Sequence, residues 1–437
     1  MSYLLQCLKQ VRQEPVRPLS FGKVKSVVGL LVEAGHVDAA VGELCYIYEH
    51  DQPGSRRVKA EVVGVRGDIA VLMPLEETVG LRTGCLVQRS AQPLTISVGA
   101  ELLGRVIDGN GRPLDNKGPL ILKETQPVHT EPPPPLERRM VDTPLYTGLR
   151  AIDAFLTLGR GQRIGIFAGS GVGKSTLLGM LARNTRADIN VIALIGERSR
   201  EVQEFIVDNL GIEGLERSVV VAVTGDQAAM SRVKGAMVAV AIAEYFRDLG
   251  KDVLLMMDSV TRVAMAQREI GLAVGEPPTT RGYTPSVFAM LPRLLERAGP
   301  GTNGTITGIF TVLVDGDDMN EPVGDAVRGI LDGHIVLSRK LAHANHYPAI
   351  DVLQSVSRVM PRVTSLEARD TANEARRLLA AYRQAEDLIR VGAYEPGTDA
   401  ETDQAVAVHE ALNRFLQQSV EESPTADPLH ELRRALG

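Results

Sequence analysis

The feature that most constrains the fold is a glycine-rich loop at residues 168–175. It reads Ala-Gly-Ser-Gly-Val-Gly-Lys-Ser, between an apolar run at 163–167 and a helix-forming run at 176–183. Glycines let backbone N–H groups turn toward phosphate oxygens, Lys174 supplies positive charge for the β and γ phosphates, and Ser175 can bind Mg²⁺. This context predicts a P-loop nucleotide site, although its first position holds alanine instead of the usual glycine. The residues expected to contact nucleotide are Ala168, Gly169, Ser170, Gly171, Val172, Gly173, Lys174, Ser175 and Thr176.

Two carboxylates follow apolar runs of the same predicted sheet. Asp258 ends the run that begins at Val253, and Glu197 lies two residues beyond Ile195. The carboxyl ends of parallel strands meet at one edge of an open sheet, so both should lie beside the P-loop. Asp258 is expected to orient a Mg²⁺-bound water, with a helix cap as the alternative. Glu197 could polarise an attacking water, or it could form a salt bridge with a following arginine, Arg198 or Arg200.

The chain divides into segments of different pattern, which together predict a multidomain α/β protein. Short β-branched runs at 23–95 indicate a small β-barrel, and a turn- and proline-rich stretch at 96–145 indicates a linker. Apolar runs alternate with helical segments over 146–365, which is typical of a P-loop domain with a mainly parallel sheet. Residues 366–437 have helical periodicity and predict a C-terminal helical domain. The main apolar runs are 164–167, 191–195, 219–223, 253–257 and 309–314.

Residues 1–22 have apolar positions at helical spacing. They predict a short amphipathic helix that either docks a partner or folds back on its own domain.

Composition narrows the class of protein. A chain of 437 residues with 44% hydrophobic and 23% charged residues has the make-up of a multidomain globular protein. Apolar runs stay shorter than the roughly 18–20 residues of a membrane helix, and the N-terminus lacks signal-peptide features; we therefore expect a cytoplasmic protein. The three cysteines form no CxxC pair and are expected to be reduced structural thiols. A net charge of −6 argues against a nucleic-acid partner.

Longer blocks carry a resemblance to a known family. They are similar to the catalytic β subunit of rotary ATP synthases and to its relatives, the flagellar and injectisome type III export ATPases. The resemblance runs from about residue 24 to about residue 418 and is densest over 145–360; it implies a RecA-like P-loop domain. The blocks are Asp258–Glu269, Gly275–Pro278, Gly282–Phe288, Leu294–Gly299, Asp332–Ser338 and Ser355–Arg358.

The resemblance implies roles for individual residues. Lys174 and Ser175 would bind phosphate and Mg²⁺, Asp258 would support the metal, and Glu197 would position the lytic water with Arg198 paired nearby. Glutamate at this place favours a catalytic subunit over a non-catalytic one.

Two further residues take roles from the same resemblance. Tyr347 would pack on adenine within the same subunit. Arg358 matches the arginine finger that enters the neighbouring subunit's site, a group worth ~10³ to 10⁵ in rate. A lone subunit should therefore be nearly inactive, and a homo-oligomeric ring, expected to be a hexamer, is implied.

The partners expected from the resemblance are those of a secretion motor. They are a stator-like regulator at the N-terminus, export gate and stalk proteins, export substrates and their chaperones. The protein would attach peripherally to the export apparatus at the inner face of the cell membrane. The stretches 167–176 and 315–322 favour the flagellar system, with the injectisome as the alternative. A proton-coupled synthase subunit and an RNA translocase stay open, although the barrel offers only Tyr46 and Tyr48 for base stacking.

Overall fold

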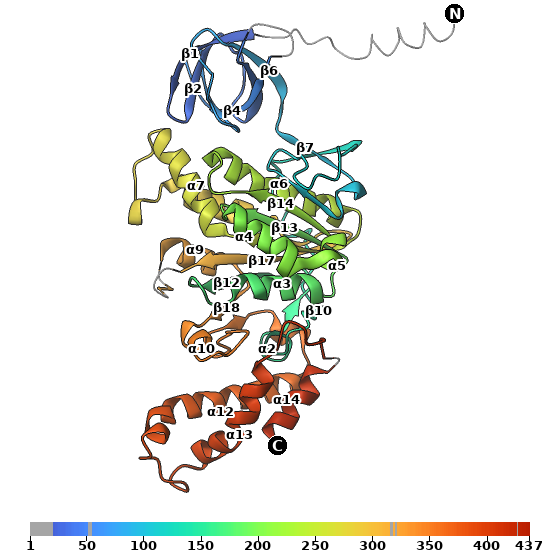
Figure 1. Cartoon of the computed structure of the whole chain (residues 1–437), viewed down its shortest axis with the longest axis vertical. Helices are drawn as coiled ribbons and strands as arrows, with labels where there is room; N and C mark the ends of the chain where they lie inside the picture. Colours follow the sequence, from blue (N-terminus) through green and yellow to red (C-terminus); the bar gives the residue numbers. More distant parts are fainter. Residues whose placement is uncertain (1–20, 51–54, 315–317, 320, 426) are drawn as a thin grey trace, which may run out of the picture. The chain divides into compact units, whose positions relative to one another are not determined.

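The computed structural model of the chain describes residues 21–50, 55–314, 318–319, 321–425 and 427–437. These fall into two units, Met1–Leu94 and Thr95–Gly437 (Figure 1). The docking helix predicted at 1–22 lies outside the described residues up to position 20. Residues 21 and 22 already belong to the first strand.

The first unit contains a closed barrel of six strands, which confirms the predicted β-barrel. Its strand order is β1-β2-β5-β4-β3-β6, with antiparallel neighbours. Alternate side chains point inward, and the buried cluster includes Val32, Ile47 and Leu72. Cys45 and Cys85 are buried free thiols. The strands are β1 Phe21–Val28, β2 Leu31–Gly35, β3 Glu43–Tyr48, β4 Arg57–Arg66, β5 Ile69–Pro74 and β6 Leu86–Pro93.

The second unit is built on a nine-stranded sheet whose main path is β19-β18-β12-β17-β15-β13-β14-β8. All pairs from β18 to β8 are parallel, whereas β19 and β16 pair antiparallel at its margins. The five predicted apolar runs form β12, β13, β14, β15 and β17. The strands are β8 Arg105–Ile107, β12 Arg163–Ala168, β13 Ile189–Ile195, β14 Ser218–Val223, β15 Asp252–Asp258, β16 Gly299–Pro300, β17 Thr305–Leu313, β18 Gly333–Leu337 and β19 Val356–Ser357.

Helices cover this sheet, and its central strands are buried on both faces, as expected of a parallel sheet. The long helix α6 packs on β13, β14 and β15, and α7 packs on α6 and α8 (Figure 1). The helices are α2 Arg150–Phe155, α3 Lys174–Asn184, α4 Ser199–Glu204, η2 Phe205–Leu210, α5 Gly211–Glu216, α6 Ala229–Asp248, α7 Val260–Ala273, α8 Pro285–Leu295, α9 Pro322–Ile330, α10 Arg339–His343 and α11 Met360–Val363.

The segment 96–145, expected to be a linker, contributes to the nucleotide-binding unit. Its strand β8 pairs in parallel with β14 and forms one edge of the large sheet. Arg105 and Asp115 fix this edge through an ion pair of 2.7 Å. A three-residue strand between turns is too short to show an alternating pattern, so the sequence presents only its turn residues. The other elements here are β7 Thr95–Val98, η1 Ala100–Leu102, β9 Glu124–Pro127 and β10 Pro144–Leu145.

The C-terminal region is helical, as predicted. It consists of α12 Leu366–Arg390, α13 Ala400–Leu416 and α14 Pro428–Leu436. Side-chain oxygens of Ser365, Asp399 and Asp427 accept backbone N–H groups at the three N-termini, which stabilises each helix start. Phe415 of α13 packs on Phe155 of α2, with ring centroids 6.2 Å apart. Within the described part of the chain, no helix combines the length and apolar character needed to span a membrane.

Candidate functional site

The P-loop joins strand β12 to helix α3 and lines a cavity of about 880 Å³. Gly171 and Gly173 have φ angles of 77° and 85°, the left-handed region that favours glycine. A Cβ on Gly173 would lie 3.3 Å from the ring of Tyr347, so this position is restricted in space as well. The predicted loop residues line the cavity apart from Val172, which is buried. Ala168 is the last residue of β12, where its small side chain is buried.

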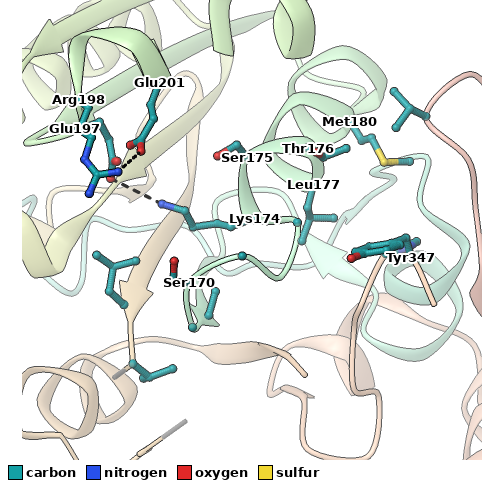
Figure 2. A pocket seen from close by; sticks show the side chains of 18 of the residues that line it. Ser170, Lys174, Ser175, Thr176, Leu177, Met180, Glu197, Arg198, Glu201 and Tyr347 are labelled. Carbon is teal, nitrogen blue, oxygen red and sulfur yellow. Dashed lines mark hydrogen bonds and ion pairs between the residues drawn. The ribbon is translucent and has the colours of Figure 1, made fainter. Parts of the chain in front are cut away.

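The start of α3 and the ends of two strands bring the predicted lysine and both carboxylates together. Figure 2 shows Lys174 pointing toward Glu197. Lys174 Nζ forms an ion pair with Asp258 and lies 3.7 Å from Glu197 Oε1. Thr311 on β17 donates a hydrogen bond of 2.7 Å to the same Asp258 oxygen. The parallel order of β12, β17, β15 and β13 places these side chains at one edge of the sheet. The charges therefore converge where the P-loop would hold phosphates.

Glu197 is electrostatically unusual. Burial raises its pKa to about 7; the nearby Lys174 charge opposes this rise, and the Asp258 and Glu201 carboxylates add to it. Within the described residues, its buried Oε1 atom has no hydrogen-bond partner. A carboxylate whose pKa is raised to about 7 and whose oxygen still lacks a hydrogen bond among the described residues suits a group that orients a water.

Arg198 does not pair with Glu197. Its side chain is 84% exposed and binds Glu201 at 3.1 Å, while Arg200 binds Glu204 at 3.2 Å. The alternative of a salt bridge between Glu197 and these arginines is therefore not the arrangement in the structure. Arg198 still lines the cavity, on the same side as Glu197 (Figure 2).

Tyr347 lies at the other end of the cavity, beyond the first turns of α3 (Figure 2). Tyr347 is 42% exposed, and its ring faces Gly173 of the P-loop. Its backbone carbonyl accepts a hydrogen bond of 3.0 Å from the N–H of Gln418, and residues 418–421 form a wall of the cavity. Sequence reasoning missed this wall because it lies about 240 residues from the P-loop and carries no motif.

Arg262 was also missed by sequence reasoning. It lies in the first turn of α7, four residues after Asp258, and lines the same cavity. Its Nε is buried without a hydrogen-bond partner among the described residues. The available signal was an arginine one helical turn beyond a strand-end aspartate in the block 258–269, a place from which its side chain can reach the site edge.

Arg358 lies elsewhere on the subunit. It follows β19, its side chain is exposed, and the cavity lining does not include it among the described residues. Its backbone N–H donates to the carbonyl of Asp332 at 2.9 Å. A role in phosphate chemistry would therefore have to be carried out in another subunit.

The oxygen atoms at the site suit a magnesium ion. The Asp258 carboxylate and the Ser175 hydroxyl are hard oxygen donors, the kind of group that Mg²⁺ prefers, and they lie beside the phosphate loop. The described residues contain no group of three histidine, cysteine or acidic side chains that could hold a metal. Mg²⁺ fits such a site because it takes one or two protein oxygens and completes its shell with phosphate oxygens and water.

The parallel sheet, the P-loop and the strand-end carboxylates define a P-loop ATPase. Family models agree segment by segment: the ATP synthase alpha/beta β-barrel domain matches residues 24–91, the nucleotide-binding domain of the same family matches 148–357, and the T3SS EscN ATPase C-terminal domain matches 364–434. The chain belongs to the ATP synthase alpha/beta family and, within it, to the flagellar and type III secretion ATPases.

Individual relatives are similar over nearly their full length. The flagellum-specific ATP synthase of Bacillus subtilis is 55% identical over 92% of both chains. The type 3 secretion system ATPase of Xanthomonas euvesicatoria is 51% identical over 92% of this chain and 90% of its own. The solved structure of the assembled ATPase EscN from enteropathogenic E. coli superposes with a TM-score of 0.89 at 47% identity, covering 95% of this chain and 100% of that one. These similarities confirm the fold, the ATPase class and the resemblance inferred from the sequence.

Proposed function

We propose that this ATPase hydrolyses Mg-ATP at the interfaces of a homo-oligomeric ring, expected to be a hexamer, and that hydrolysis energises type III protein export for flagellum assembly. The observation that carries the proposal is an incomplete site. Lys174, Glu197 and Asp258 converge at the P-loop, whereas Arg358 is exposed away from that cavity. The similarity to an ATPase described as assembled supports a ring.

The site residues would divide the work as follows. Lys174, which pairs with Asp258 in this structure, would pair with the β and γ phosphates when nucleotide binds. Ser175 and Asp258 would hold Mg²⁺, which neutralises phosphate charge when bound. Glu197 would orient the attacking water through Oε1, which accepts no hydrogen bond from the described residues. Tyr347 would pack on the base, since its exposed ring faces the cavity opposite the carboxylates (Figure 2).

Arg358 would act in the neighbouring subunit. Charge spreads over the γ phosphate in the transition state, and a guanidinium placed there is worth ~10³ to 10⁵ in rate. Because its side chain is exposed, Arg358 needs no rearrangement of its own core to enter a partner site. Arg198, which is also exposed and lies beside Glu197, would assist at the same interface.

The flagellar system is favoured by the relatives, since flagellum-specific ATP synthases from Bacillus subtilis and Treponema pallidum are 55% and 53% identical. The injectisome is the second candidate because of the Xanthomonas enzyme at 51%. A stalk partner is supported by the solved complex of EscN with its central stalk EscO. By family resemblance we extend the proposal to a stator-like regulator at the N-terminus, an export gate, substrates with chaperones, and a peripheral place at the inner face of the membrane.

The shared site is tested by mixing two inactive variants. Glu197→Gln removes the water-orienting carboxylate, and Arg358→Ala removes the finger. We expect steady-state ATPase activity to rise steeply with protein concentration, to vanish in each variant and to return partly on mixing. Activity that is independent of concentration and survives Arg358→Ala would overturn the proposal.

The cellular role is tested by deleting the gene for this protein in the bacterium that carries it. Loss of filaments and swimming, restored by the wild-type chain but not by Glu197→Gln, supports the flagellar role. Normal filaments together with lost export of other proteins would favour the injectisome instead.

A further inference from the structure

Gln162 is a fully buried amide at the start of the strand that leads to the P-loop. It directly precedes β12, and its side chain has no exposed surface. Its Oε1 accepts the N–H of Gly159 at 2.9 Å. Its Nε2 donates to the backbone carbonyl of Asp332 at 3.3 Å and to Ser357 Oγ at 3.1 Å. The amide thus links the start of β12 to Asp332, the residue before β18, and to Ser357 of β19, the residue before Arg358.

The acceptors of Gln162 are the groups that hold the base of Arg358. The Asp332 carbonyl also accepts the N–H of Arg358 at 2.9 Å, and Ser357 is the residue directly before it. Ser357 in turn donates its hydroxyl to the carbonyl of Thr157 at 3.1 Å. The Arg358 backbone is therefore fixed by a network that ends on Gln162.

The packing around this network leaves little room for adjustment. β18 and β19 pair Gly333 with Ser357, and a Cβ on Gly333 would lie 2.3 Å from the carbonyl oxygen of Val356. The Asp332 carboxylate binds the backbone N–H of Arg163 at 3.0 Å and its Nε at 3.2 Å. The strand that ends in the P-loop thus begins beside the residues that carry Arg358.

The orientation of the Gln162 amide follows from its partners. Gly159 N–H can only donate and the Asp332 carbonyl can only accept, so the oxygen faces the former and the NH₂ group faces the latter. Every polar atom of the amide is used. In a buried setting such a network defines one geometry, and its loss leaves acceptors without partners.

We propose that Gln162 is a positioning residue for Arg358, through which the strand carrying one subunit's P-loop also sets the placement of the guanidinium that enters the next subunit's site. This inference rests on the proposed role of Arg358 between subunits. Gln162 touches no nucleotide-binding group in its own subunit, so its effect would appear at the neighbouring site. A shift of about 1 Å in a catalytic group can cost on the order of 10²-fold in rate.

The test uses Gln162→Met, which keeps the volume and removes the amide. Alone, we expect its ATPase rate to fall on the order of 10²-fold while nucleotide affinity stays unchanged. When Gln162→Met is mixed with Glu197→Gln, activity should return. The Gln162→Met subunit has an intact Glu197, and its site then receives a correctly placed Arg358 from the neighbouring Glu197→Gln subunit. Mixed with Arg358→Ala, activity should stay low, because neither subunit supplies a well-placed finger. In a ring assembled at random from equal amounts of two variants, about one quarter of all head-to-tail interfaces hold a complete site. This fraction sets the recovery of activity to expect.

A second variant and a control keep the result interpretable. Ser357→Ala removes one acceptor of Gln162 and should show the same pattern more weakly. Asn190→Leu is the control, because this buried amide on β13 donates to Ala182 and Ser218 and contacts neither strand beside Arg358. It should not discriminate between the two mixing partners.

The pattern of rescue separates the possible failures. Rescue of Gln162→Met by Arg358→Ala but not by Glu197→Gln would overturn the inference, because the defect would then lie in its own site. Rescue by neither, with normal rings, would overturn it as well and indicate a structural role alone. If Glu197→Gln and Arg358→Ala fail to rescue each other, the proposed function itself fails.

Discussion

Replacing Glu197 by glutamine should stabilise the nucleotide-free protein in a pH-dependent manner. Burial raises the pKa of Glu197 from 4.5 to about 7 in the folded chain. Between these values the folded state binds a proton that the unfolded state has released, so the wild type gains stability as pH falls. Above pH 7 the folded protein holds a buried charge at a cost, and glutamine, which resembles the protonated carboxyl, removes that cost.

The size of the effect follows from the shift. One pKa unit corresponds to about 1.4 kcal/mol, so Glu197→Gln should raise the free energy of unfolding by about 3 kcal/mol at pH 8 and by less than about 1 kcal/mol near pH 5. For a unit as large as Thr95–Gly437, this corresponds to a rise in Tm of about 5 °C at pH 8.

Thermal unfolding of both proteins from pH 5 to pH 8.5, without nucleotide, measures this difference. Glu213→Gln, at an exposed position on α5, is the matched control and should leave Tm unchanged throughout. If the difference in Tm between the two proteins stays constant with pH, or if the wild type is more stable than Glu197→Gln at pH 8, Glu197 is not a buried carboxyl with a raised pKa. ATPase activity of the wild type should fall as pH drops through about 7, since only the ionised Glu197 can orient water.

Substitutions at Tyr347, Arg297 and Asp258, and removal of Mg²⁺, also have definite expected outcomes. Tyr347→Ala should weaken nucleotide binding about tenfold in a fluorescence titration through lost ring contact, whereas Tyr347→Phe should bind normally; equal loss in both would point to the hydroxyl. Arg297 is buried and binds Glu244 through two hydrogen bonds of 2.6 and 2.9 Å, so Arg297→Ala should lower the free energy of unfolding in urea by about 3–5 kcal/mol. Removing Mg²⁺ with EDTA should abolish hydrolysis, and Asp258→Asn should do the same while circular dichroism stays unchanged; full activity in EDTA would exclude the metal role.

The sequence predicted the parts of the site that are local. Residues 168–175 show their function because a loop that surrounds phosphate needs glycine, lysine and a hydroxyl at fixed spacing. Glu197 and Asp258 could be placed beside that loop because buried parallel strands leave long apolar runs, and their carboxyl ends share an edge.

Contacts between distant segments could not be read in the same way. Residues 418–421 reach the cavity only because α13 packs on α2 through Phe415 and Phe155, and no local pattern records that packing. Arg262 resembled any solvent-facing arginine on a helix until the sheet edge was known. Arg358 was assigned by resemblance alone, and the structure adds that it lies away from its own subunit's cavity.

Strand β8 determines where the chain can be truncated to give a stable fragment. β14 is buried along its whole length, and its outer hydrogen-bonding edge is covered by Arg105–Ile107. A fragment beginning at residue 146 would look like a complete ATPase domain in the sequence. It would lack β8, however, and the outer edge of Val219–Val221 would lose its partner strand, leaving only the pairing with β13. A bare, apolar strand edge pairs readily with other chains and leads to aggregation. Fragments for solution studies should therefore begin at Thr95, so that the nucleotide-binding sheet keeps its covering strand.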